Sequence, residues 1–463
     1  MQPEKEEPLS TVDRDRLSSL MAREERRFEA AHPISRERFE RARRSMLAGV
    51  PMPWMTEWAG PYPVFVDHAE GAHFTDVDGH DYVDFCLGDT GAMTGHSPKM
   101  TVEAIARQAA RGITLMLPTE DSIWVGEEMA RRFGLPYWQF CLTATDANRF
   151  TLRLARALTG RPKVLVYSWC YHGSVDETIV TLASGATAPR PGNVGPAVDP
   201  ALTTRVVEFN DLPALEEALA HRDVACVLAE PALTNIGIVL PDPGYHEGLR
   251  QLTRRYGTYL VIDETHTICV GPGGATRAWG LEPDFLTIGK PLAGGVPAAC
   301  YGMSEEVAGR VQAHMETLPT TDVGGVGGTL SGNALSLAAM RATLEHVLTE
   351  EAFGRMIPLA ERWAAGVRAG IDGAGLPWEV QGLGARAEYW FCPHPPRTGG
   401  EAAAADDHEL ARFMHLYALN RGILLTPFHN MALMSPETSA EDVDRHTDVF
   451  AEATRELTSA GTR

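Results

Sequence analysis

The central part of the sequence alternates short apolar runs with segments long enough to form helices. The runs are PKVLVYS at 162–168, VACVLAE at 224–230, TYLVIDE at 258–264 and FLTIGK at 285–290. Each run is rich in strand-forming residues and is bounded by glycine, proline or charge, while the stretches between them have a helical period. This alternation is typical of βαβ units, so we expect an α/β fold with a mostly parallel sheet flanked by helices.

The segments before this region have a different pattern. Residues 10–48 are charged, and their helical period places Leu17, Leu20 and Met21 on one face, which predicts an arm or a packed helix. Residues 60–84 alternate apolar and polar side chains and contain Asp-Gly and Glu-Gly pairs, which are turn signals. We expect small antiparallel strands there.

The C-terminal part is predicted to form a second, smaller lobe. After about residue 333 the pattern becomes helices followed by strands. Residues 395–407 have little apolar area to bury, so we expect a surface loop or local disorder there. We therefore divide the chain into an N-terminal arm with small strands that pack with the small domain (1–90), a large domain (91–335) and a C-terminal small domain (336–463).

Charge and cysteine content limit the partners that this chain can have. Its formal net charge is -20, which disfavours binding to nucleic acids and to anionic membranes. The seven cysteines are scattered and form no C-x-x-C pair, which suggests a reducing compartment and no structural metal. The start of the sequence, MQPEKEEPLS, resembles neither a signal peptide nor a transit peptide, and no apolar run approaches the roughly 20 residues that span a bilayer. We expect a soluble, cytoplasmic protein.

Three charged side chains stand where predicted strands end. Glu230, Asp263 and Lys290 each follow an apolar run, and the carboxyl ends of parallel strands are where open sheets bind ligands. Buried charges need partners, so these side chains predict a ligand of mixed charge. Pyridoxal 5'-phosphate (PLP) fits, with Lys290 forming the Schiff base and later acting as the base, and with Asp263 keeping the ring nitrogen protonated.

Other residues are predicted to hold the phosphate and the ring. Thr143, Ala144 and Thr145 precede a helix expected to begin near Ala147, so that backbone donors and hydroxyls would meet the phosphate. Taken singly, a strand-end lysine or a Thr-x-Thr has an ordinary structural explanation, and only the joint order favours a cofactor site. The remaining candidates are Tyr171 as an aromatic lid, its neighbour His172, and Thr329 in the glycine-rich segment 324–333 as a second phosphate hydroxyl.

With these residues in place, the chain resembles the class III aminotransferases of the fold type I PLP enzymes. The resemblance is greatest to the branch near glutamate-1-semialdehyde aminomutase and β-phenylalanine aminotransferase, and it runs from about residue 40 to the C-terminus. The matching motifs, in order, are GHSP (95–98), TATDAN (143–148), YHG (171–173), EPALTNIG (230–237), IDETHT (262–267), IGKPLAGG (288–295) and GTLSGN (328–333).

The resemblance implies a fold type I architecture, with a seven-stranded, mostly parallel sheet in the large domain and a smaller α+β domain. It also implies a homodimer, or a tetramer built from dimers, with active sites shared between subunits. In such a dimer Thr329 would reach the phosphate bound by the neighbouring chain. Asn235 would contact the ring hydroxyl of the cofactor, and Glu230 would support the site from behind.

Several positions depart from the family pattern. Thr143-Ala144-Thr145 stands where Ser-Gly-Thr is usual, and Thr265 replaces a usual valine beside Asp263. In the β-phenylalanine branch two arginines grip carboxylates, and Trp54 and Phe428 align with them. The other candidates for the substrate pocket are Met52, Met55 and Trp58, which with those aromatic residues suggest an apolar pocket for a hydrophobic or aryl amine, and Arg386, which could bind an acid co-substrate.

The leading prediction is a transaminase (EC 2.6.1.-) that moves an amino group from an amine or amino acid to a keto acid or aldehyde. It would use a ping-pong mechanism through an internal aldimine on Lys290. An aminomutase, epimerase or lyase of the same fold is an alternative that would use the same residues. A P-loop ATPase is a remote alternative, because Gly289-Lys290 is followed by Pro291 and lacks the required first glycine.

Overall fold

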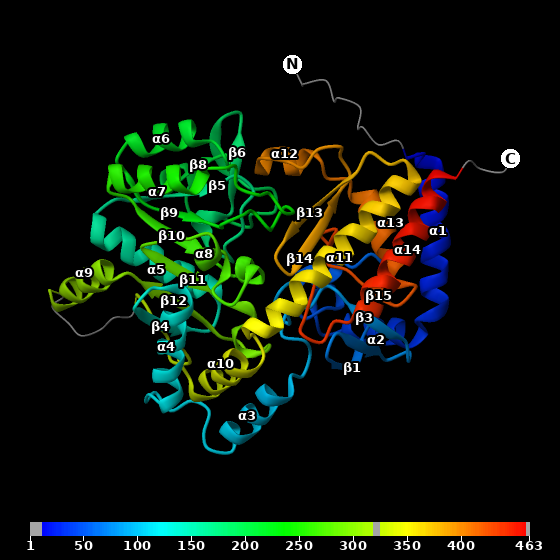
Figure 1. Cartoon of the computed structure of the whole chain (residues 1–463), viewed down its shortest axis with the longest axis horizontal. Coiled ribbons are helices and arrows are strands. Elements are labelled where there is room, and N and C mark those ends of the chain that lie inside the picture. The colour runs from blue at the N-terminus through cyan, green and yellow to red at the C-terminus, as the bar shows by residue number, and fades with distance from the viewer. Residues whose placement is uncertain (1–11, 318–324, 460–463) are drawn as a thin grey trace.

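The computed structural model describes residues 12–317 and 325–459, and its main feature is a seven-stranded sheet (Figure 1). Only the second strand in the sheet order is antiparallel to its neighbours, and the other strands are parallel to one another. The order is β4 (Tyr137–Cys141), β12 (Ala299–Met303), β11 (Phe285–Ile288), β10 (Tyr259–Asp263), β9 (Val224–Ala229), β5 (Lys163–Tyr167) and β8 (Thr204–Val207). The predicted mostly parallel sheet is confirmed.

The central strands are buried along their whole length, which explains their continuous apolar sequences. Helices from the intervening segments pack against the sheet: α5 contacts β9, β11 and β12, α6 contacts β8 and α7 contacts β10. The helices of this part are α3 (Lys99–Ala109), α4 (Glu120–Phe133), α5 (Ala144–Thr159), α6 (Leu212–Ala220), α7 (Tyr245–Tyr256), α8 (Gly274–Ala278), α9 (Glu305–Glu316) and α10 (Ala334–His346). A separate hairpin is formed by β6 (Val180–Ala183) and β7 (Ala186–Pro189).

The N-terminal segment packs with the C-terminal one. Helix α1 (Arg14–Ala31) buries Leu17, Leu20 and Phe28, and it lies beside α13 (His408–Leu419) and α14 (Ala440–Thr458) (Figure 1). The predicted small antiparallel strands are confirmed. They are β1 (Val66–Glu70), β2 (His73–Asp76) and β3 (Asp81–Asp84), preceded by α2 (Pro33–Ala42), and the late strand β15 (Ile423–Leu424) pairs in parallel with β3.

Helices and then strands follow residue 333, as predicted. The long helix α11 (Glu350–Ala374) packs on α14 and on the sheet of β13 (Glu379–Leu383), β14 (Arg386–Trp390) and β16 (Met431–Leu433). The structure does not test the proposed domain boundaries, which remain a prediction. Residues 1–11, and with them the start of the predicted arm, lie outside the described residues.

The prediction for residues 395–407 is wrong, because this segment contains the helix α12 (Gly399–Ala404). Thr398 caps its N-terminus through the Glu401 amide, and Ala402 is buried among apolar residues of the large sheet. A β-carbon on Gly399 would lie 2.0 Å from the Ser168 carbonyl oxygen, so the backbone itself packs closely there. Close packing therefore orders a segment that has few large apolar side chains.

All seven cysteines are free thiols. Among the described residues, no helix is both long enough and apolar enough to cross a lipid bilayer.

Candidate active site

The three strand-end residues lie at one edge of the large sheet. Strands β9, β10 and β11 are neighbours and parallel, so Glu230, Asp263 and Lys290 follow or end them on the same side. Lys290 has a φ of 52°, a left-handed conformation that is unfavourable for lysine and is held by the surrounding fold. The structure thus confirms that these residues lie at the carboxyl edge.

A cavity of about 450 Å³ opens at this edge. It contains both predicted catalytic residues and most of the predicted cofactor contacts. Its lining includes Trp54, Thr143, Ala144, Thr145, Tyr171, His172, Asp263, Thr265, His266 and Lys290. Residues from five separate parts of the sequence therefore meet in one space of the size that small-molecule ligands occupy.

Asp263 forms the charged floor of this cavity. Its carboxylate accepts hydrogen bonds from Asn148 Nδ2 (2.8 Å) and the Thr265 amide (3.1 Å), and it pairs with His172 Nδ1 (2.9 Å). Burial alone would raise the pKa of Asp263. The hydrogen bond and charge of His172, together with hydrogen bonds from Thr265 and Asn148, instead lower this pKa to about 2. Asp263 is therefore ionised and able to stabilise a proton on a bound heterocycle.

His172 supports this carboxylate from behind. Burial opposes its charged form, but contacts with Cys170 and Asp263 raise its pKa well above the usual value. Two buried polar atoms at the cavity, His172 Nε2 and Thr265 Oγ1, have no hydrogen-bond partner among the described residues. Such atoms fit a polar ligand in the cavity, because buried polar groups are normally hydrogen-bonded.

The first turn of α5 forms the end of the cavity where a phosphate would fit. The prediction that this helix begins near Ala147 is wrong: it begins at Ala144, because Thr143 Oγ1 accepts the Asp146 amide and serves as the N-cap. The early backbone N–H groups of a helix lack partners within it and attract anions. Gly173 lies close by with φ of 81°, and a β-carbon there would stand 2.1 Å from Thr145 Oγ1.

Two residues that contact Lys290 were missed by the sequence prediction. Lys290 Nζ donates a hydrogen bond to Asp89 Oδ2 (2.8 Å) and lies 2.7 Å from His266 Nε2. His266 Nδ1 lies 3.1 Å from Thr90 Oγ1. Asp89 follows β3 in a GDTG loop where Leu87, Asp89 and Thr90 all have positive φ, so an unusual backbone presents its carboxylate to the lysine.

Neighbouring charges determine whether Asp89 and His266 are protonated. Burial would raise the pKa of Asp89, but the positive charge of Lys290, together with that of Arg386, lowers it well below its usual value. Burial and the charge of Lys290 lower the pKa of His266 well below its usual value, so its imidazole is neutral. The acidic loop residue and the histidine in IDETHT were the available sequence signals, although neither type of residue is diagnostic alone.

Aromatic side chains form the mouth of the site. The ring of Trp54 lies 5.4 Å from that of Tyr171 and 5.6 Å from that of Phe428. Trp54 and Phe428 remain 43% and 45% exposed in the single chain. Phe428 lines a neighbouring cavity of about 210 Å³ rather than the one at Lys290. Met52 and Met55 are exposed and Trp58 is half-buried, and none of these three lines either cavity.

Four other predicted site residues lie outside the Lys290 cavity. Glu230 is buried and accepts hydrogen bonds from the Thr234 amide and hydroxyl and from the Tyr171 amide. Asn235 lines the neighbouring cavity, and its amide oxygen can accept from Arg190 at 2.9 Å. Arg386 is fully buried and donates to the Thr234 carbonyl (3.0 Å), while Thr329 is exposed. The predicted roles of these residues remain untested.

Proteins of known sequence and structure resemble this chain over most of its length. The aminotransferase class-III family profile matches residues 54–441. Glutamate-1-semialdehyde 2,1-aminomutase of Neisseria meningitidis is 33% identical over 424 residues, which are 89% of this chain and 97% of that protein. A glutamate-1-semialdehyde-aminomutase structure from Pseudomonas aeruginosa PAO1 is 54% identical with a TM-score of 0.94, over 96% of this chain and 99% of that one.

A more distant solved structure has the same fold. An omega-transaminase from Sphaerobacter thermophilus is 28% identical, with a TM-score of 0.83 over 92% of this chain and 98% of that one. A variant of the Pseudomonas protein was crystallised with PMP, the amino form of the cofactor. On this evidence the chain belongs to the class III aminotransferase family and is a PLP-dependent enzyme with the type I fold.

Proposed function

We propose that this enzyme is an aminomutase, which moves an amino group between neighbouring carbons of one substrate molecule. The observation that carries the proposal is the 54% identity, over 96% of this chain, to the Pseudomonas aeruginosa protein described as a glutamate-1-semialdehyde-aminomutase. Curated relatives at 33–34% identity have the same name. The proposal therefore favours an aminomutase, which the sequence predicted as an alternative, over the transaminase that was its leading prediction.

The residues of the cavity would hold the cofactor in a fixed orientation. Bound PLP supplies an electrophilic carbonyl carbon and a ring that withdraws electrons from the substrate. Asp263 would keep a proton on the ring nitrogen, since its low pKa keeps the carboxylate charged. The first turn of α5 would receive the phosphate, and Lys290 would attach the cofactor covalently.

Asp89 and His266 would orient the amine of Lys290. When Lys290 is not bound to the cofactor, its amine has a defined place between Asp89 Oδ2 and His266 Nε2. Asp89 Oδ2 and neutral His266 Nε2 would each accept a hydrogen bond from the amine. These two bonds would orient the lone pair of neutral Nζ as a base that takes up a proton in one step and gives it back in the next.

An aminotransferase for hydrophobic or aryl amines is a second candidate. The observation that favours it is the aromatic mouth formed by Trp54, Tyr171 and Phe428, which is better suited to a flat apolar group than to a carboxylate. The 28% identity to an omega-transaminase is in keeping with this candidate. Both candidates use the cavity floor in the same way, so the floor does not discriminate between them.

The enzyme is further proposed to act as a homodimer. Thr329 is exposed and does not line the cavity of its own chain. If it binds phosphate, it must therefore do so in another copy of the chain. Sedimentation analysis of the holoenzyme would test this, and a monomer that remains fully active would contradict it.

The deciding experiment compares intramolecular with intermolecular transfer. The enzyme in its amino form is given glutamate 1-semialdehyde without any second amino compound, and the 5-amino-4-oxopentanoate that results from exchange between C2 and C1 is measured. Repeated turnover to this product supports the aminomutase. A stoichiometric transfer from an aryl amine to pyruvate, with no turnover of the semialdehyde, would instead establish the second candidate.

A further inference from the structure

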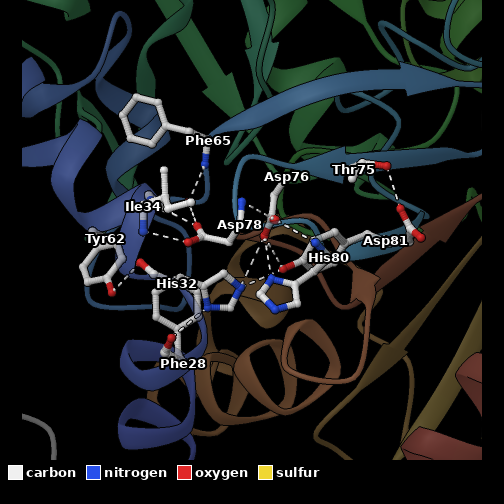
Figure 2. Close-up of polar contacts among 12 residues, drawn as sticks. Phe28, His32, Ile34, Tyr62, Phe65, Thr75, Asp76, Asp78, His80 and Asp81 are labelled. Carbon is white, nitrogen blue, oxygen red and sulfur yellow. Dashed lines mark hydrogen bonds and ion pairs between the residues drawn. The ribbon is translucent and has the colours of Figure 1, made fainter.

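A cluster of two histidines and one carboxylate lies outside the active site (Figure 2). His32 stands between α1 and α2, Asp76 ends β2, and His80 lies in the turn before β3. Asp76 Oδ2 is 3.4 Å from His32 Nε2 and 3.2 Å from His80 Nδ1. None of the three residues lines the cavity at Lys290.

Hydrogen bonds to the backbone determine which atoms of His32 and Asp76 have free lone pairs. His32 Nδ1 lies 2.8 Å from the Phe28 carbonyl oxygen, which can only accept, so Nδ1 carries the proton and Nε2 carries a lone pair. Asp76 Oδ1 accepts the amides of Asp78 and His80, both at 2.9 Å, which fixes the carboxylate with Oδ2 toward the histidines.

Two possible donors face the lone pairs of this cluster. The hydroxyl of Tyr82 lies 2.8 Å from His32 Nε2 and 2.9 Å from Asp76 Oδ2, but it has only one proton to donate. His80 Nδ1 donates to Asp76 Oδ2 in one tautomer of its ring and has a lone pair there in the other. The Asp78 carboxylate adds no donor, because it accepts from Ile34 and from Ser35. In the second tautomer, lone pairs of all three residues face one another with the single Tyr82 proton beside them, and a cation would stabilise that arrangement.

From this arrangement we infer that His32, Asp76 and His80 form a site for a divalent transition metal ion such as Zn²⁺. Bonds of about 2.0–2.1 Å in a tetrahedron separate ligand atoms by about 3.3–3.4 Å, close to the two distances observed. Two imidazoles and one carboxylate suit zinc-like ions rather than Ca²⁺ or Mg²⁺, which prefer oxygen. The bond from His32 Nδ1 to a backbone carbonyl is the usual support for a metal-binding histidine.

The site joins two segments that are separate in the chain. His32 belongs to the N-terminal helices, whereas Asp76 and His80 belong to the β2–β3 hairpin. A bound ion would therefore hold the helices on the hairpin and raise the stability of the native state. This inference is independent of the proposed function, and it opposes the sequence prediction that no metal is bound.

The test is a zinc titration of the holoenzyme after dialysis against a chelator. One equivalent per chain should bind and should raise the melting temperature, and Co²⁺ at the same site should give the visible bands of tetrahedral coordination. His80→Ala is the informative variant, because its side chain is 41% exposed and its backbone amide bond to Asp76 remains. We expect it to weaken zinc binding by at least tenfold and to abolish the rise in melting temperature.

His68→Ala is the matched control, since His68 also pairs with an aspartate, at 3.1 Å, but on an exposed strand. It should bind zinc like the unmodified enzyme. Cofactor absorbance and circular dichroism show whether each variant is folded. Absence of stoichiometric binding, or equal loss of binding in His80→Ala and His68→Ala, would overturn the inference.

Discussion

The floor and the mouth of the active-site cavity are built differently. On the floor, Asp263 is buried and has hydrogen-bond partners on α5 and on the loops beside the strand ends. At the mouth, Trp54 lies in a short 3-10 helix (Pro53–Thr56) and Phe428 in a loop, both are almost half exposed, and their rings pack edge to face. The floor is thus fixed by the fold, whereas the mouth can vary without disturbing the sheet. This difference suggests that the floor determines the chemistry and the mouth determines the substrate.

Lys290→Ala should have the largest effect. It removes both the covalent attachment of the cofactor and the base, so kcat should fall by at least about 10²–10⁴-fold, the usual contribution of a general base. The visible absorption of the enzyme-bound cofactor should also change. Lys99→Ala, on the exposed start of α3, is the control. Turnover within tenfold of the unmodified enzyme would rule out the proposed role of Lys290.

Asp263→Asn should have the next largest effect. It keeps the shape of the floor but removes the charge that stabilises a proton on the cofactor ring, so kcat should fall by about 10²–10³-fold, as for the loss of one electrostatic contact. Glu264→Gln is a useful control, because Glu264 is buried one residue along but does not line the cavity. If both variants lost activity equally per folded molecule, the floor would have no special electrostatic role.

Trp54→Ala should have a smaller effect that depends on the substrate. Loss of an aromatic wall should lower kcat/KM for an aryl amine by about 10–200-fold, the range for contacts in a hydrophobic pocket, and should change turnover of a small aliphatic substrate little. Trp279→Ala, which removes a similarly exposed tryptophan away from this cavity, is the control. An equal loss for both kinds of substrate would show that the mouth does not select between them.

Asp89→Asn should have the smallest effect, because it removes a charge beside Lys290 without removing a reacting group. The ion pair of 2.8 Å between Asp89 Oδ2 and Lys290 Nζ becomes a neutral contact in the variant, so kcat should fall by about fivefold or less, the usual worth of one partly exposed ion pair. Steady-state kinetics of the purified holoenzyme measures this change. A fall as large as that of Asp263→Asn would contradict the minor role expected for Asp89.

The sequence predicted best where one kind of interaction dominates. Continuous apolar runs identified β9, β10 and β11, and these strands bring Asp263 and Lys290 to one edge. Helix α12 was missed because its order depends on close packing against Ser168 rather than on large apolar side chains. Asp89 was missed because its position depends on a loop of residues with positive φ, which has no periodic pattern.

The mouth was harder to predict than the floor for a related reason. Trp54 lines the cavity as expected, but Phe428 borders the neighbouring cavity, because the course of its loop is set by packing from distant segments. The start of α5 was misplaced by three residues because Thr143, and not a later residue, is the N-cap of the helix. The predicted roles in cofactor and substrate binding await the experiments above.

The pairing of β3 with β15 has a consequence for the nascent chain. These strands hydrogen-bond to each other although one lies near the start of the sequence and the other near its end. During synthesis the first hairpin therefore emerges with an open edge that stays unpaired until Ile423 and Leu424 have left the ribosome. Slow docking of this late strand would limit the yield of native enzyme, and a chaperone that covers the edge would raise it.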